Sequence, residues 1–300
     1  MSRSFRLCAV TALAAVTVLV AACGERAEPL ARDIPPYPVT VAGARERPLI
    51  LRGPPERVVA LAPGVAELAG ALGAGRRIVG APADVVVRGA PRAARVVSPA
   101  GLVDVAGVVR LRPDLMLAGE ATPADPLDAI ADETRAPVYV QPEQSLRDVR
   151  QAMLEVALLL GDPPRGRVLA ANLLRRIDDV ERRADGLAPV PVFLDLGFNT
   201  TVPPRSLAAD LVRTAGGRPL GTSRAGRPLG DCRVRRLRPA VVLVLDGIAR
   251  RPFARRRCRG APRFRGRIVE LPADLVLTPG PRVGNALLAV ARALHPNAFP

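Results

Sequence analysis

The chain has 300 residues, of which 49% are hydrophobic, and a formal net charge of +16. This length exceeds one ordinary domain, and the apolar content suffices for two lobes with cores of their own. Every basic side chain is arginine, and only eight residues are aromatic. The scarcity of platforms for stacking bases argues against nucleic-acid binding as the reason for the positive charge. It is typical of a solvated face near an anionic membrane or of an anion-attracting surface.

The N-terminus resembles a bacterial export signal. Arg3 and Arg6 precede an uncharged apolar run at 7–22, which is shorter than the roughly 20 residues of a spanning helix. Small residues then lead to Cys23, as in a lipobox, where the cysteine receives an acyl lipid such as palmitate. We expect 1–22 to be a lipoprotein signal peptide and 23–36 a lipidated tether that holds the protein outside the cytoplasm. An ordinary secretory signal with a chance cysteine is the alternative.

Two cysteines belong to the mature part beyond the tether. Without the signal, 42 arginines face 28 acidic residues, a net charge of +14, and thirteen arginines lie in 231–267. Cys232 and Cys258 form an even pair in an oxidising compartment, which favours a disulfide. A bridge would brace this arginine-dense segment. A metal site and a pair of free thiols are the alternatives, and the single histidine makes the metal site the weaker one.

Short β-like runs alternate with helical stretches, which predicts an α/β fold. In an N-terminal lobe at 37–144 we expect strands at 57–61, 78–80, 114–118 and 137–140 and helices at 65–72 and 105–111. A helical segment at 145–187 contains helices at 145–160 and 164–185. A C-terminal lobe at 188–300 contains strands at 192–196, 241–245 and 268–271 and helices at 206–215 and 285–294.

The order of several short motifs is similar to that of a known family. Residues 55–61 read PERVVAL, 111–115 read LRPDL, and 237–239 repeat the LRP of that motif before the strand at 241–245. The turn at 215–218 reads AGGR, and PGPR at 279–282 precedes the last helix. Together these motifs resemble the substrate-binding proteins of iron-siderophore, haem and vitamin B12 importers.

The resemblance implies two Rossmann-like lobes joined by a single long helix, with the ligand in a cleft between them. It implies capture of a scarce chelate, delivery to an ABC permease, no catalysis and no cofactor. We expect a monomer. The family docks its permease through one carboxylate on each lobe, but those positions fall at Ala106 and Cys232. Asp104 and Asp231 lie nearby as possible substitutes. A scaffold or sensor lipoprotein that has lost productive docking is therefore the alternative function.

Ligand contacts in such a fold come from loops that follow strands. Arginine forks suit an anionic ferric chelate, so Arg205 and Arg282 are the first candidates, each with a surface role as its alternative. Haem needs an axial ligand, usually Tyr or His. Tyr37 falls in the tether region, Tyr139 in a strand and His295 at a structural C-terminus. We therefore expect a ferric siderophore, with cobalamin less favoured and haem least. The remaining ligand candidates are Asn199, Thr201, Glu120 and Arg88.

Overall fold

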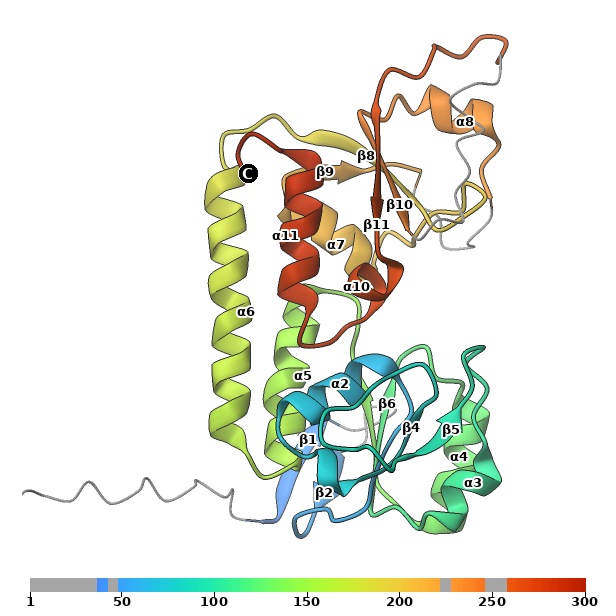
Figure 1. Cartoon of the computed structure of the whole chain (residues 1–300), viewed down its shortest axis with the longest axis vertical. Coiled ribbons are helices and arrows are strands. Elements are labelled where there is room, and N and C mark those ends of the chain that lie inside the picture. Colours follow the sequence, from blue (N-terminus) through green and yellow to red (C-terminus); the bar gives the residue numbers. More distant parts are fainter. Residues whose placement is uncertain (1–36, 43–47, 222–227, 246–257) are drawn as a thin grey trace, which may run out of the picture. The chain divides into compact units, whose positions relative to one another are not determined.

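The structure is a computed structural model that describes residues 37–42, 48–221, 228–245 and 258–300. All of these belong to one compact unit, 34–300 (Figure 1). The signal at 1–22 and Cys23 lie outside the described residues, so the expectation of a lipid anchor stays a prediction. Within the described ranges, no helix combines the length and apolarity needed to cross a membrane.

The N-terminal lobe is built on a five-stranded parallel sheet with the order β5-β4-β3-β6-β7. Every residue of β6 is buried, as expected for a parallel strand covered on both faces. The hairpin of β1 and β2 (Val39–Ala42, Pro48–Leu51) precedes the sheet. The other elements are β3 (Val58–Ala60), α2 (Pro63–Ala71), η2 (Gly75–Arg77), β4 (Ile78–Pro82), β5 (Ala94–Val97), α3 (Val105–Arg110), β6 (Leu115–Gly119), α4 (Ala124–Thr134) and β7 (Val138–Gln141).

The C-terminal lobe holds a four-stranded parallel sheet with the order β11-β10-β8-β9. The apolar run of β10 is fully buried between β8 and β11. The elements are β8 (Val190–Asp195), α7 (Leu207–Thr214), β9 (Gly217–Pro219), α8 (Asp231–Arg236), β10 (Val241–Leu245), β11 (Arg267–Leu271), α10 (Ala273–Leu277) and α11 (Val283–Leu294). The α/β fold with two lobes that the sequence predicted is confirmed.

Two helices connect the lobes, α5 (Leu146–Leu159) and the long α6 (Pro163–Ala184). Ser145 caps α5 by accepting from the Asp148 N–H, and Asp162 caps α6 by accepting from the Arg165 N–H. α6 packs against α5 and, further along, against α11 of the C-terminal lobe (Figure 1). The predicted helix at 164–185 therefore exists and spans both lobes.

The lobes also touch directly, and each contact joins segments that follow the carboxyl ends of strands. After β7, the Gln141 side chain donates to the Pro279 carbonyl at 2.5 Å. The N–H of Leu146 donates to the Asp210 carboxylate at 2.9 Å. Gly64, at the start of α2, has no side chain, and a Cβ there would lie 2.5 Å from the Pro279 oxygen. The carboxyl edges of the two sheets thus meet at one junction.

An ion pair strengthens this junction. The Arg282 guanidinium donates to both carboxylate oxygens of Glu67 on α2, at 3.0 and 2.7 Å. It also donates to Asp274 of its own lobe at 3.1 Å. The hydrogen bonds to Glu67 raise the pKa of Arg282. Burial lowers this pKa, but the charge of Glu67 and the bond to and charge of Asp274 add to the rise. We call this group of three side chains the Arg282 clasp.

Gly166 sets how closely α5 and α6 cross. A Cβ at this buried position would collide with the Ala157 side chain and lie 2.9 Å from the Met153 carbonyl. Gly166→Ala should therefore destabilise the protein by about 1–3 kcal/mol, although Ala is otherwise favoured over Gly inside a helix. Urea denaturation of the mature chain measures the change. Gly53→Ala, which meets nothing within 4 Å, is the control, and equal stability of both variants would contradict the close crossing.

The Arg282 clasp can be tested by a double-mutant cycle. Arg282→Gln, Glu67→Gln and the double variant should give a coupling energy of about 0.5–1.5 kcal/mol, because the pair is bidentate and only partly exposed. The matched control is Arg110 with Asp104, whose closest atoms are 3.9 Å apart on exposed side chains. Its coupling should be near zero. A clasp coupling no larger than that control would show that the pair does not hold the lobes.

Candidate functional site

The loop after β8, at the carboxyl edge of the C-terminal sheet, displays an exposed aromatic side chain. The buried Asp195 carboxylate accepts the Gly197 N–H at 2.9 Å and fixes the start of this loop. Burial raises the pKa of Asp195, partly offset by backbone hydrogen bonds from Gly197 and Asn199. Phe198 and Asn199 then take left-handed backbone angles, φ 54° and 60°. The turn leaves the Phe198 side chain 78% exposed, which suits an aromatic contact surface.

Asn199 and Thr201, both predicted to bind ligand, are buried within this loop. The Asn199 side-chain amide donates to the Asp231 carboxylate at 2.7 Å, and the Asn199 backbone carbonyl accepts the Leu229 N–H. Thr201 is 1% exposed, and its hydroxyl has no hydrogen-bond partner in the described structure. Neither side chain is available to a ligand at the surface in this conformation.

The N-terminal lobe contributes two neighbouring carboxyl groups. Glu120 follows β6 and is exposed, and Gln144 donates to it at 3.3 Å. Glu143 follows β7 and lies against Gly119, where any Cβ would collide with its carboxylate. Burial, reinforced by the negative charge of Glu120, raises the pKa of Glu143 to about 7. One of the two carboxyl groups can therefore donate a hydrogen bond near neutral pH while the other accepts.

The three arginines predicted to bind ligand differ in their position and in their partners. Arg205 is exposed just before α7, at the carboxyl edge, with no partner among the described residues. Arg282 is at the junction but uses its donors in the clasp. Arg88 lies elsewhere, because its backbone packs against Gly75, which precedes the amino end of β4. The structure therefore brings Arg205 and Glu120 to the same junction but does not bring Arg88 there.

The predicted permease-docking carboxylates have local partners. Asp104 caps α3 by accepting the Gly107 N–H at 2.9 Å, and Asp231 at the start of α8 accepts from Asn199. The sulfur of Cys232 is joined to that of Cys258 in a disulfide. Cys232 thus occupies the second expected docking position as half of a cross-link.

The potential axial ligands lie away from the junction's loops. The Tyr139 hydroxyl is buried and donates to Glu155 at 2.7 Å, and burial followed by this bond raises the pKa of Tyr139. Tyr37 belongs to the folded unit rather than to the tether, since its hydroxyl donates to the Leu159 carbonyl at 3.2 Å. Tyr37 therefore lies in the N-terminal lobe, whose expected range of 37–144 includes it, and not in the tether region. His295 is the C-cap of α11.

Sequence reasoning missed Phe198 and Glu143. The Gly197-Phe198-Asn199 string was a turn signal, because glycine and asparagine tolerate left-handed backbone. It gave no sign that the aromatic ring would be exposed. Glu143 had no signal, since its burial depends on Gly119, far away in the sequence.

Glu143 makes stability depend on pH. Its pKa is raised from an ordinary 4.5 to about 7, so the folded chain retains a proton that the unfolded chain releases. This contribution is complete below about pH 4.5 and is lost as the pH rises through about 7. Glu143→Gln should therefore exceed wild-type stability by roughly 1–3 kcal/mol above pH 7, by urea denaturation. Glu120→Gln is the companion variant and should lower the pKa of Glu143. A pH-independent difference for Glu143→Gln would contradict the burial argument.

Known proteins share both the sequence pattern and this architecture. The family model described as periplasmic binding protein matches residues 58–253. YvrC of Bacillus subtilis, described as an uncharacterised ABC transporter substrate-binding lipoprotein, is 22% identical over 308 residues and 96% of each chain.

Solved structures of this architecture are similar over most of the chain. The haem-binding protein RhuT of Roseiflexus, in its apo form, is 26% identical with a TM-score of 0.66, covering 82% of this chain and all of its own. The vitamin B12-binding protein BtuF of Vibrio cholerae is 20% identical with a TM-score of 0.68, covering 80% and 97%. At that identity BtuF shows the fold alone. The match to the family model over 58–253 assigns this chain to the periplasmic binding protein family.

Proposed function

We propose that this protein is the extracytoplasmic, lipid-anchored substrate-binding component of an ABC importer and captures a ferric siderophore-type chelate. The observation that carries the proposal is the junction of the two carboxyl edges, because Phe198 and Arg205 follow a strand end of one lobe and Glu120 and Glu143 follow strand ends of the other. Ligands of open α/β sheets bind at such edges. Family membership and the lipoprotein relative in Bacillus subtilis support the transport role.

The anchoring part of the proposal rests on Cys23. The lipobox pattern before it agrees with the description of the Bacillus relative as a lipoprotein. Acyl chains hold a protein at a membrane at ~0.8 kcal/mol per buried CH₂. A tethered binder would stay close to its permease after it releases the substrate.

The placement of Tyr37, Tyr139 and His295 supports a chelate over haem. Haem iron takes an axial ligand from the protein, commonly one of these residue types. Both tyrosine hydroxyls are engaged in the interior, and the histidine sits at the end of α11. A siderophore surrounds its metal with its own oxygens and needs no such ligand. Cobalamin shares that property but presents a large ring, for which this aromatic-poor chain offers few surfaces.

The charges at the junction refine the substrate class. Because the clasp occupies Arg282, the described junction offers Arg205 as its available cation and Glu120 with Glu143 as its acids. A chelate with an anionic group and a donor-bearing arm would satisfy both lobes. The disulfide at Cys232 and the absence of a carboxylate at Ala106 favour one second candidate, a lipoprotein of the same fold that acts as scaffold or sensor. If the protein instead delivers its substrate to an importer, Asp104 and Asp231 would dock the permease.

Titration of the chain from Gly24 onward separates these possibilities, since it contains the whole folded unit. We expect calorimetric binding of a ferric siderophore, weaker binding of cobalamin and weakest binding of haem. Phe198→Ala and Arg205→Gln should each weaken siderophore binding by about tenfold, whereas Arg92→Gln on an exposed loop should not. Folding of every variant is checked by circular dichroism. Absence of binding to all three ligands would overturn the substrate proposal and leave the scaffold candidate.

A further inference from the structure

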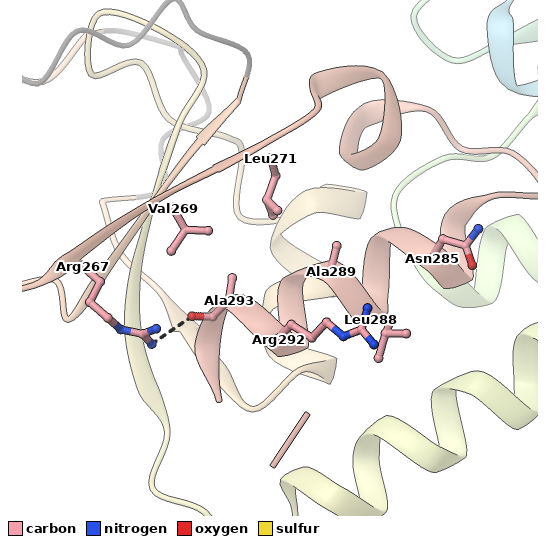
Figure 2. Close-up of a pocket in the computed structure, with 8 residues that line it drawn as sticks. All are labelled: Arg267, Val269, Leu271, Asn285, Leu288, Ala289, Arg292 and Ala293. Carbon is pink, nitrogen blue, oxygen red and sulfur yellow. Dashed lines mark hydrogen bonds between the residues drawn. The ribbon is translucent and has the colours of Figure 1, made fainter. Parts of the chain in front are cut away.

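Three cavities on and beside the C-terminal lobe share lining residues. One of about 740 Å³ lies at the amino ends of β10 and β11. A second of about 510 Å³ lies between β11 and α11 (Figure 2). A third of about 560 Å³ lies between α6 and α11. Arg267 lines the first two, while Leu288 and Arg292 line the last two. Because they share walls, we treat them as one surface, the arginine groove.

The groove is strongly cationic. Its walls contain nine arginines and a single acid, Asp179. Arg183 and Arg182 already pair with Asp179 at 3.2 and 3.7 Å. Arg263 and Arg292 are exposed, and the described structure gives their guanidinium groups no carboxylate partner. The groove therefore carries positive charge that the fold does not neutralise.

The middle of the groove is apolar. Val269 and Leu271 of β11 point toward α11, which contributes Leu288 and Ala289 (Figure 2). β11 is the edge strand of its sheet, so among the described residues no further strand pairs along its outer edge. The Arg267 guanidinium donates to the Ala293 and Leu294 carbonyls at 2.9 and 3.1 Å, which fixes the wall at that end. An apolar floor between cationic walls suits an amphiphile with a negatively charged head.

We propose that the arginine groove binds the phosphate headgroups of anionic phospholipids and seats the C-terminal lobe on a membrane surface. Guanidinium presents forked donors that match phosphate oxygens, which ammonium does not, and every cation of this chain is an arginine. The apolar floor accepts the glycerol and first acyl carbons beneath a headgroup. A polybasic surface gains attraction from each charge near an anionic leaflet. An acidic peptide would match the walls but would leave the apolar floor without a partner.

Flotation with lipid vesicles tests this inference on the chain from Gly24 onward, which lacks the acyl anchor. We expect binding to phosphatidylcholine vesicles doped with phosphatidylglycerol and none to phosphatidylcholine alone. The groove triple variant Arg176→Gln, Arg263→Gln, Arg292→Gln takes one or more charges from each cavity. It should weaken vesicle binding on the order of a hundredfold. The control triple Arg52→Gln, Arg76→Gln, Arg92→Gln removes the same charge from exposed positions of the other lobe and should weaken it only slightly.

The outcomes distinguish the possible occupants. Equal loss in the two triples would mean that binding follows net charge, and the proposal would fall. Release of the protein from vesicles by millimolar inorganic phosphate would assign the groove to the free anion instead. If the groove triple lost affinity for a polyglutamate peptide but kept its affinity for vesicles, an acidic protein segment would be the occupant and the proposal would be wrong. Circular dichroism confirms that both triples fold, and siderophore binding, which uses the junction, should be unchanged in both.

Discussion

The Arg282 clasp is the contact on which the geometry of the junction depends. It joins α2 of one lobe to the segment before α11 of the other with two hydrogen bonds to a single carboxylate. Gly64 allows the Pro279 backbone to approach α2 at the same place. Together with α6, these contacts limit how far the carboxyl edges can separate. A helix and an ion pair are stiffer connections than paired flexible strands, so the site is shaped largely before a ligand arrives.

The clasp also decides which charges a ligand meets. Arg282 pairs with Glu67 and Asp274, so its single positive charge is offset within the clasp by two carboxylates. Glu120 and Glu143 lie at the N-terminal lobe's edge, and the burial of Glu143, reinforced by the charge of Glu120, raises the pKa of Glu143 to about 7. The strong positive charge of the chain is displayed instead along α6, α11 and β11 of the C-terminal lobe. The net charge of +16 is thus distributed unevenly, with acidic groups at the N-terminal lobe's edge and positive charge along α6, α11 and β11.

Periodic apolar patterns predicted the long elements well. β10 has five apolar residues in a row, and the apolar residues of α6 recur at helical spacing. These patterns in the sequence were enough to predict both elements. Shorter or less regular elements escaped notice, including the β1–β2 hairpin, β5, α4, β9, α8 and α10. In β5 two of four residues are exposed, which hides the strand pattern. These elements are held by neighbours that a linear pattern does not reveal.

Site residues were harder to predict for a related reason. The sequence predicted Arg282 as a ligand contact, but its carboxylate partner Glu67 is 215 positions away. No local pattern could show that the guanidinium is already occupied. Thr201 and Asn199 looked accessible because loops usually are, yet the Asp195 turn draws them inside. Arg88 follows a strand but runs back along α2 because Gly70 and Gly75 leave room for its backbone.

The turn at Phe198 has a further consequence. Left-handed backbone at a phenylalanine is costly, of order 1–3 kcal/mol, and the fold meets that cost through the Asp195 and Asn199 hydrogen bonds. The ring is therefore held outward in the empty protein and does not have to be ordered by its ligand. Preorganisation of this kind reduces the entropy lost on association. Under the proposed function, a rigid chelate whose outline fits this fixed ring would lose less entropy on binding than a flexible one of equal charge.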